Sequence, residues 1–109
     1  MRDVMLERQE VWVAEIEARV VAMMALAQDM VSQLYVLPDF QGCGIGGRLL
    51  AEAKRRRPRG LRLFTFQSNI RARRFYEARG FTAIAFTDGA ENEERAPDVL
   101  YEWTGRENA

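Results

Sequence analysis

The sequence predicts an α/β fold in which a mixed, mostly antiparallel sheet carries two helices. Runs rich in β-branched and aromatic residues recur along the chain and indicate strands. Two stretches with helical spacing of apolar residues lie between such runs, and a glycine-rich segment at residues 41–47 separates one strand from the helix after it. With 109 residues, 48% of them hydrophobic, the chain suffices for one buried core. We therefore expect a single domain over residues 1–109, with the order β-β-β-α-β-α-β-β.

The first part of the chain carries three predicted strands, at residues 11–16, 20–27 and 30–37, with turns at residues 17–19 and 28–29. The run at residues 20–27 is almost continuously apolar, as in a strand covered on both faces. In the third strand the alternation breaks where the bulky Leu34 and Tyr35 follow Gln33, which predicts a β-bulge there. Residues 1–10 are mixed and polar, and strand, short helix and frayed end all remain open for them.

Two helices are predicted. The first begins after Gly46 and ends before Pro58, and the second covers residues 70–79, with Asn69 as its N-cap and Gly80 at its end. The strand at residues 61–66 lies between them, so that a right-handed crossover should make it the parallel neighbour of the strand at 30–37. The residues expected on the inner sides of the helices are Leu49, Leu50 and Ala53 in the first, and Ile70, Phe75 and Ala78 in the second.

The C-terminal part carries two further predicted strands, at residues 81–86 and 99–103. An acidic loop between them, beginning at Asp88-Gly89 and including Glu91 to Glu94, is expected to be solvated. Residues 105–109 are expected to form a loose tail.

The glycine-rich segment, residues 41–47, is the strongest functional pattern in the chain. Glycine permits backbone angles that a Cβ forbids and lets a ligand approach the main chain closely. The first turn of the following helix presents N–H groups without intrahelical acceptors and the positive end of the helix dipole. Strand, glycine loop and helix together predict an anion site, most naturally for phosphate or pyrophosphate. The absence of Gly-Lys-Ser/Thr after the loop excludes a nucleotide-binding P-loop of the kinase type.

Composition excludes several other classes. Cys43 is the only cysteine and there is no histidine, so an intramolecular disulfide, imidazole-based triads and a zinc site are all excluded. No apolar run reaches the roughly 20 residues that cross a bilayer. Residues 1–8 contain acids and lack the apolar core of a signal peptide. We expect a cytoplasmic protein with no metal and no membrane partner.

A basic run, KRRRPR at residues 54–59, ends the first predicted helix, although the formal net charge of the chain is zero. Such a run resembles a nucleic-acid patch. A solvated helix end, where cations complement the dipole, is the preferred interpretation, and nucleic-acid binding is the minor one. In a third interpretation Arg74, Arg79 or a residue of the run meets phosphates of a bound cofactor.

Two motifs in the right order resemble those of the GNAT acetyltransferase superfamily, over about residues 11–103. The first is Q/R-x-x-G-x-G/A, which reads Gln41-Gly42-Cys43-Gly44-Ile45-Gly46 here. The second is N-x-x-A-x-x-F-Y-E-x-x-G-F, represented by Asn69, Ala72, Phe75, Tyr76, Glu77, Gly80 and Phe81.

The resemblance implies that acetyl-CoA binds where the strand before the glycine loop and the strand after its helix splay apart. The N–H of Leu34 would then face the thioester carbonyl, Val36 would pair with the pantetheine, and the loop amides would hold the pyrophosphate. The cofactor-binding positions implied are Leu34, Val36, Gln41, Gly42, Cys43, Gly44, Ile45, Gly46, Gly47, Asn69, Ala72, Phe75 and Tyr76. Cys43 is not expected to act as a nucleophile.

The implied reaction is direct transfer of an acetyl group to a primary amine of a small molecule or peptide. Leu34, through its N–H, and Tyr76 are the implied catalytic residues, with Tyr76 as the acid that protonates the departing thiolate. Some members carry a glutamate where this chain has Met30, and Glu15, Glu17 and Asp29 remain open as bases.

The family usually begins with a further strand and one or two helices, which build much of the acceptor side. Here only about ten residues precede the first predicted strand at residue 11. A shortened domain of this kind would expose apolar surface, so a homodimer that completes the missing side is expected. A non-catalytic module that binds acyl-CoA or regulates another protein is the alternative function.

Overall fold

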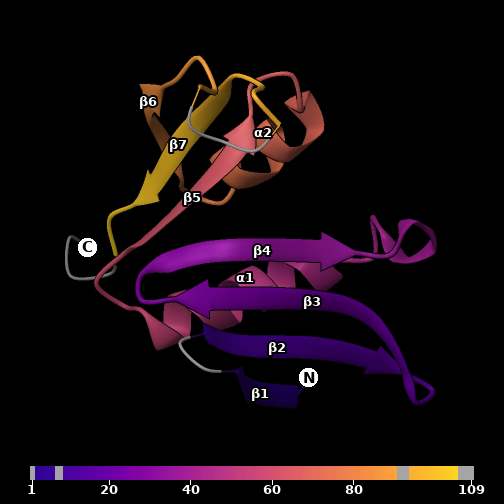
Figure 1. Cartoon of the computed structure of the whole chain (residues 1–109). Helices are drawn as coiled ribbons and strands as arrows, with labels where there is room; N and C mark the ends of the chain where they lie inside the picture. Colours follow the sequence, from indigo (N-terminus) through magenta and orange to yellow (C-terminus); the bar gives the residue numbers. More distant parts are fainter. Residues whose placement is uncertain (1, 7–8, 91–93, 106–109) are drawn as a thin grey trace. The chain divides into compact units, whose positions relative to one another are not determined.

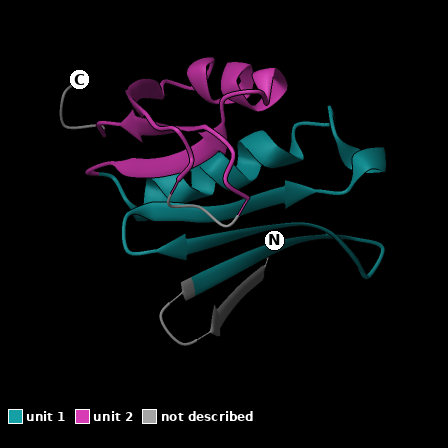
Figure 2. Cartoon of the chain, turned by 45° about the horizontal axis from the view of Figure 1, so that its top comes forward, with its two compact units in different colours: residues 1–58 teal, residues 59–109 magenta. Residues whose placement is uncertain are grey.

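The computed structural model describes residues 2–6, 9–90 and 94–105. Its contacts divide the chain into two compact units, residues 1–58 and residues 59–109, which Figure 2 distinguishes by colour. In the described part of the chain, no helix is both long and apolar enough to cross a membrane.

Unit 1 is an antiparallel sheet followed by a helix (Figure 1). Its strands pair in chain order, each antiparallel to the next. Its elements are β1 (Arg2–Leu6), β2 (Gln9–Ile16), β3 (Arg19–Ala27), β4 (Met30–Val36), the 3₁₀ turn η1 (Pro38–Phe40) and α1 (Ile45–Arg56).

Strand β1 resolves the alternatives that the sequence left open for residues 1–10. Its backbone pairs with β2, from Arg2 opposite Val13 to Leu6 opposite Gln9. Only two residues, 7 and 8, separate β1 from β2. The described order in this unit is therefore one strand longer than predicted.

The β2–β3 turn closes without the Asn-Gly or Asp-Gly pair that such turns prefer. Glu17 and Ala18 both have positive φ, 52° and 67°, which matches a type I′ turn and the right-handed twist of the two strands. Gln28, in the β3–β4 turn, has a φ of 57°. Pairing of the flanking strands therefore forces left-handed backbone onto residues that seldom adopt it.

The predicted β-bulge exists, but it lies earlier in β4 than expected. Ala25 pairs with Gln33 and Leu26 with Val31, so Ser32 is the extra residue. Its hydroxyl donates to the carbonyl of Ala25 at 3.3 Å. The prediction at Leu34-Tyr35 was wrong, because both residues pair regularly with Met24 and Met23 of β3.

The core of unit 1 lies between its sheet and the apolar side of α1. Leu49, Leu50 and Ala53 are buried, as the helical spacing predicted. Successive residues of β3 are buried although they point to opposite faces, which confirms a strand covered on both sides. The buried residues of the three strands are Trp12, Val13, Val21, Ala22, Met24, Ala25, Leu26 and Val31.

Unit 2 contains a three-stranded antiparallel sheet and a short helix. Its elements are β5 (Leu61–Phe66), α2 (Ile70–Glu77), β6 (Thr82–Phe86) and β7 (Asp98–Trp103), and β7 pairs with both other strands. The last strand of the chain is thus central, and its Val99 and Tyr101 are fully buried. The remaining core residues of this unit are Leu61, Leu63 and Phe81.

Helix α2 is shorter and less buried than the sequence predicted. It ends at Glu77, and Gly80 follows with a φ of 90°. Ile70 is 49% exposed and Ala78 is also exposed, so their assignment as inner positions was wrong. The half-buried residues Ala72, Arg73, Phe75, Tyr76 and Arg79 mark the inner side, because packing on the sheet turned the helix away from the predicted side.

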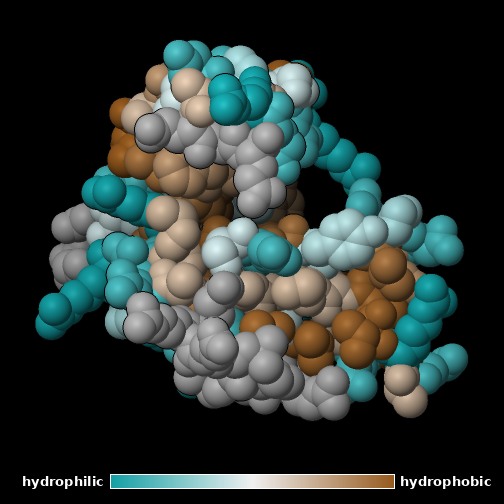
Figure 3. Space-filling model, viewed as in Figure 1, coloured by the Kyte–Doolittle hydropathy of each residue, from teal (hydrophilic) through white to brown (hydrophobic). Residues whose placement is uncertain are grey.

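Large apolar side chains are exposed on both units. Figure 3 shows hydrophobic residues gathered over the right-hand part of the unit 1 sheet, toward the β2–β3 turn. Ile16 and Val20 flank that turn and are 42% and 44% exposed. In unit 2, Phe64 and Phe86 are more than half exposed. The predicted acidic loop falls partly, at residues 91–93, and the predicted tail mostly, at residues 106–109, outside the described residues.

Replacing Leu50, which is 1% exposed on α1, with alanine should lower the free energy of unfolding by about 2–5 kcal/mol. The lost methyl groups leave a cavity that the packed helix and sheet cannot fill. Urea denaturation followed by circular dichroism measures the change. Val20→Ala, at an exposed position, is the control and should cost less than about 1 kcal/mol. Equal losses in the two variants would contradict the packing of α1.

Candidate functional site

The glycine loop, residues 41–44, joins η1 to α1 within unit 1. Gly42 and Gly44 have φ of 81° and 84°, in the left-handed region that favours glycine. A Cβ built on either residue meets nothing within 4 Å. Backbone conformation therefore requires glycine at both positions, and the space beside them is open to a ligand.

The first turn of α1 presents unpaired amides beside this open space. Gly44 is the N-cap and supplies no side-chain hydrogen bond. The N–H of Arg48 makes the first bond of the helix, to the carbonyl of Gly44 at 3.1 Å. The N–H groups of Ile45, Gly46 and Gly47 consequently have no acceptor within the helix. The first turn carries no acidic residue, so the dipole and the free amides both favour an anion there.

Gln41 ties the loop to the end of β4. Its Nε2 donates to the carbonyl of Val36 at 3.0 Å. The sequence placed Gln41 in the binding motif but predicted no hydrogen-bond partner for its side chain. The structure brings it together with Val36, a second predicted site residue. Cys43 is exposed, and its thiol lies 4.0 Å from the carbonyl of Gln41.

The backbone of β4 directs the groups of Leu34 and Val36 away from β3. Leu37 donates its N–H to the carbonyl of Val21 at 2.8 Å, so Leu37 faces β3. Backbone groups alternate along a strand, and the N–H of Val36 and of Leu34 therefore point away from β3. Their pairs with Ala22 and Met24 are the non-hydrogen-bonded ones. This direction is the one that a ligand along β4 requires.

The second motif lies entirely in unit 2. The side chain of Asn69 accepts a hydrogen bond from the N–H of Ala72 at 3.1 Å, which confirms the predicted N-cap. The rings of Phe75 and Phe81 contact Tyr76 edge-on, with centroids 5.2 Å and 5.8 Å from its own. The motif therefore builds a capped helix and an aromatic cluster around Tyr76.

Tyr76 is half-buried in this cluster, and burial raises the pKa of its phenol to about 12. Desolvation disfavours the phenolate, so the hydroxyl carries its proton at neutral pH. Tyr76 can then donate a proton or hydrogen bond, and it cannot serve as a base. This state is the one that a general acid requires.

Two residues beyond the predicted set hold α2 on the sheet. The hydroxyl of the buried Tyr101 donates to Glu77 Oε2 at 2.5 Å and accepts from Arg73 Nε at 3.1 Å. Arg73 also donates to the carbonyl of Gln67 at 3.3 Å. Of the three residues in this hydrogen-bonded cluster, Glu77 was marked by the second motif. Nothing in the sequence pointed to Tyr101 or Arg73.

The three carboxylates proposed as bases occupy different parts of unit 1. Glu15 and Glu17 are exposed, at the end of β2 and in the β2–β3 turn. Asp29 is exposed in the β3–β4 turn, at the opposite end of the sheet. Their positions do not select one of them. No group of three or more acidic, cysteine or histidine side chains that could hold a metal occurs among the described residues.

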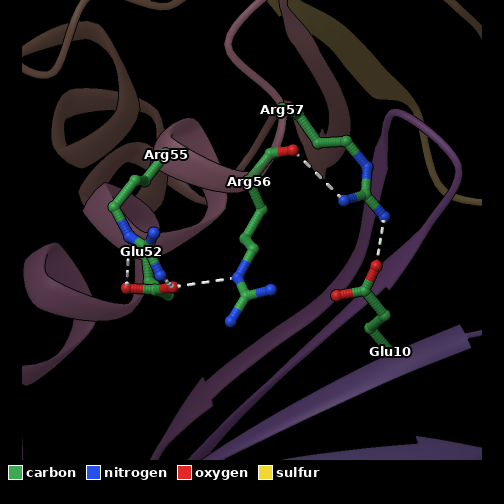
Figure 4. Close-up of polar contacts among 5 residues, drawn as sticks. All are labelled: Glu10, Glu52, Arg55, Arg56 and Arg57. Carbon is green, nitrogen blue, oxygen red and sulfur yellow. Dashed lines mark hydrogen bonds and ion pairs between the residues drawn. The ribbon is translucent and has the colours of Figure 1, made fainter.

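The basic run at residues 54–59 is largely engaged with other side chains, as Figure 4 shows. Arg57 donates to Glu10 Oε1 at 2.8 Å and to the carbonyl of Gln28 at 2.5 Å. Arg55 and Arg56 both bind Glu52, and the Arg56 guanidinium lies 4.4 Å from the centre of the Trp12 ring. Both the solvated-end and the nucleic-acid interpretations missed these contacts, which join α1 to β2 and to the β3–β4 turn.

The family model described as acetyltransferase (GNAT) domain matches residues 7–83. This match covers more than half of the chain. The chain belongs to the GNAT acetyltransferase family. A search of curated proteins found no match.

Solved structures resemble this GNAT chain throughout. The apo-form of YjaB from Escherichia coli has a TM-score of 0.77 and 27% identity over 88% of this chain and 65% of its own. A GNAT family acetyltransferase from Elizabethkingia anophelis with acetyl-CoA bound has a TM-score of 0.78 and 19% identity, over 90% of this chain and 77% of its own. The ribosomal-protein-S18-alanine N-acetyltransferase from Escherichia coli has a TM-score of 0.72 and 20% identity, over 94% of this chain and 73% of its own.

The similarities confirm the predicted fold class, an α/β fold with a mostly antiparallel sheet and two helices in the GNAT order. The GNAT chain spans less than two thirds of the length of YjaB. The binding groups of unit 1 and the Tyr76 cluster of unit 2 correspond to the two GNAT motifs of the sequence. Their roles in binding and catalysis stay predictions.

Replacing Arg57 with methionine should lower the free energy of unfolding at pH 7 by about 1–2 kcal/mol, because two charge-assisted contacts of a mostly buried guanidinium are lost. The Arg57 guanidinium, chiefly through its hydrogen bond, holds the pKa of Glu10 below the usual 4.5. The folded state therefore binds fewer protons than the unfolded state near that pH, and stability from this pair is lost as the pH falls.

The difference between wild type and Arg57→Met should consequently shrink below about pH 4.5. Thermal denaturation across pH 3–7 measures it. Arg59→Met, at an exposed position of the same run, is the matched control and should cost less than about 0.5 kcal/mol. A constant difference across this pH range would count against the ion pair.

Proposed function

We propose that this chain is an acetyl-CoA-dependent N-acetyltransferase that acts on a primary amine. The observation that carries the proposal is two sets of backbone donors in unit 1, one on β4 and one at the start of α1. The N–H groups of Leu34 and Val36 point away from β3, and the strand leads into a loop with open space at Gly42 and Gly44 and free amides at the start of α1. An extended ligand with a diphosphate at one end and a carbonyl at the other would match these two sets of donors.

In the proposed reaction a neutral amine attacks the thioester carbonyl of acetyl-CoA. A C–N bond forms, the C–S bond breaks, and the N–H of Leu34 stabilises the charge that develops on the carbonyl oxygen. Tyr76, which is protonated at neutral pH, gives its proton to the departing thiolate. The proton lost by the amine passes to water or to a carboxylate, for which Glu15, Glu17 and Asp29 remain candidates.

The proposal requires both units, since Leu34 and the loop belong to unit 1 and Tyr76 to unit 2. The family match supports one functional domain, because it begins in unit 1 and ends in unit 2. The acceptor class, a homodimer and a cytoplasmic location stay predictions. The exposed Ile16, Val20 and Tyr35 support self-association.

A non-catalytic acyl-CoA-binding module is the second candidate. It shares the binding residues of unit 1 and does without proton transfer by Tyr76. The match of residues 7–83 to an acetyltransferase domain is what favours an enzyme over this module.

Replacing Gly44 with alanine should weaken binding of acetyl-CoA by about tenfold or more, because the new methyl group enters the open space beside the free amides. Isothermal titration calorimetry measures the Kd. Gly105→Ala is the control, since Gly105 has a similar φ of 96° and lies beyond β7. It carries the same backbone strain and should leave the Kd within about twofold. Equal Kd values for wild type and Gly44→Ala would place the diphosphate elsewhere.

Replacing Tyr76 with phenylalanine should lower kcat by about 10²–10⁴-fold with little change in the Kd for acetyl-CoA, since general acid catalysis is lost and the ring is kept. Release of CoA is followed with a thiol reagent in the presence of a polyamine, an aminoglycoside, an amino acid and a peptide with a free N-terminus. Tyr35→Phe, at an exposed position of β4, is the matched control and should retain kcat. Tight acetyl-CoA binding without turnover of any of these amines would favour the non-catalytic module.

A further inference from the structure

Tyr101 connects the central strand of unit 2 to two successive turns of α2. Its ring is fully buried on β7, and its hydroxyl lies between Glu77, to which it donates, and Arg73, from which it accepts. Arg73 and Glu77 are four residues apart and so occupy the same side of the helix. One phenol therefore restrains both the position of α2 along its axis and its rotation about that axis, relative to β7.

Helix α2 depends on this contact because it has little else to hold it. It has eight residues, none of which is buried, and a helix of this length is not stable by itself in water. Asn69 caps its N-terminus. The hydrogen bonds of Tyr101, together with the contact between its ring and that of Tyr76, anchor the C-terminal half of α2 to β7.

The position of the Tyr76 phenol follows from the position of this helix. Tyr76 precedes Glu77 directly, and its ring lies 6.2 Å from that of Tyr101. Ring contacts with Phe75, Phe81 and Tyr101 surround it, whereas no described hydrogen bond holds its hydroxyl. A small rotation of α2 would therefore swing the hydroxyl away from a fixed reacting atom.

We propose that Tyr101, held between Arg73 and Glu77, is a positioning residue that sets the place of the Tyr76 hydroxyl during acetyl transfer. This inference rests on the proposed function, in which Tyr76 donates the proton. Tyr101 itself acts through α2 and is not assigned a contact with the reacting atoms.

The test is a double-mutant cycle of Tyr101→Phe and Tyr76→Phe, with kcat and KM measured for acetyl-CoA and the amine that gives turnover. Tyr101→Phe keeps the buried ring and removes only the hydroxyl. It should lower kcat by about tenfold while the KM for acetyl-CoA stays within about twofold, since a misplaced catalytic group affects the transition state more than binding. In the Tyr76→Phe background it should lower kcat no further, because the group that it positions is absent.

Two further variants separate positioning from simple destabilisation. Glu77→Gln keeps an oxygen that accepts from Tyr101 and should retain more kcat than Glu77→Leu, which cannot accept. Arg62→Gln breaks the ion pair of β5 with Glu102 of β7, at 3.0 Å, without touching α2, and should leave kcat unchanged. These comparisons are made at a temperature at which circular dichroism shows every variant folded.

An equal loss of kcat from Tyr101→Phe in both backgrounds, or no loss at all, would overturn the positioning role and leave the proposed function intact. A wild-type protein that releases no CoA with any amine, or a Tyr76→Phe variant with unchanged kcat, would instead overturn the role of Tyr76 as acid and with it this inference. The two failures are therefore distinguishable in the same set of measurements.

Discussion

The burial of Leu49, Leu50 and Ala53 against the unit 1 sheet is the interaction on which the glycine loop and the start of α1, proposed above to bind the cofactor, depend. It fixes where α1 lies and hence where its first turn presents free amides. Arg57, bonded to Glu10, fastens the other end of the same helix. A helix held along its apolar side and at its C-terminus cannot rotate or slide, so the placement of the amides at its N-terminus follows from core packing.

Arginine side chains make several of the other contacts that hold the elements in place. Arg57 connects α1 to β2 and to the β3–β4 turn, Arg73 connects α2 to β7, and the Arg79 guanidinium lies 3.9 Å from the centre of the Phe75 ring. The guanidinium suits this role because its planar fork offers several donors and its stem packs on apolar surface. A cluster of cations in the sequence therefore need not form a ligand-binding surface.

The two halves of the proposed site use different chemical groups. The candidates in unit 1 are the backbone N–H groups of Leu34, Val36 and the start of α1, whereas the candidate in unit 2 is the side chain of Tyr76. Backbone donors are aimed by strand register and helix geometry, and many side chains are compatible with them. The phenol is aimed by the contacts of one short helix, which makes its position sensitive to residues such as Tyr101.

Patterns in the sequence were enough to predict the order of most elements, the glycine loop, the cap at Asn69 and, through two motifs, the family. These features are short-range, because periodicity, φ preference and capping each involve residues a few positions apart. The position of the bulge at Ser32 and the direction of the Leu34 and Val36 amides, away from β3, became evident only in the folded chain. The same holds for the contact of Arg57 with Glu10 and for that of Tyr101 with α2. Strand register and contacts between residues 24 or 47 positions apart depend on how whole elements pack, and no local spacing in the chain specifies them.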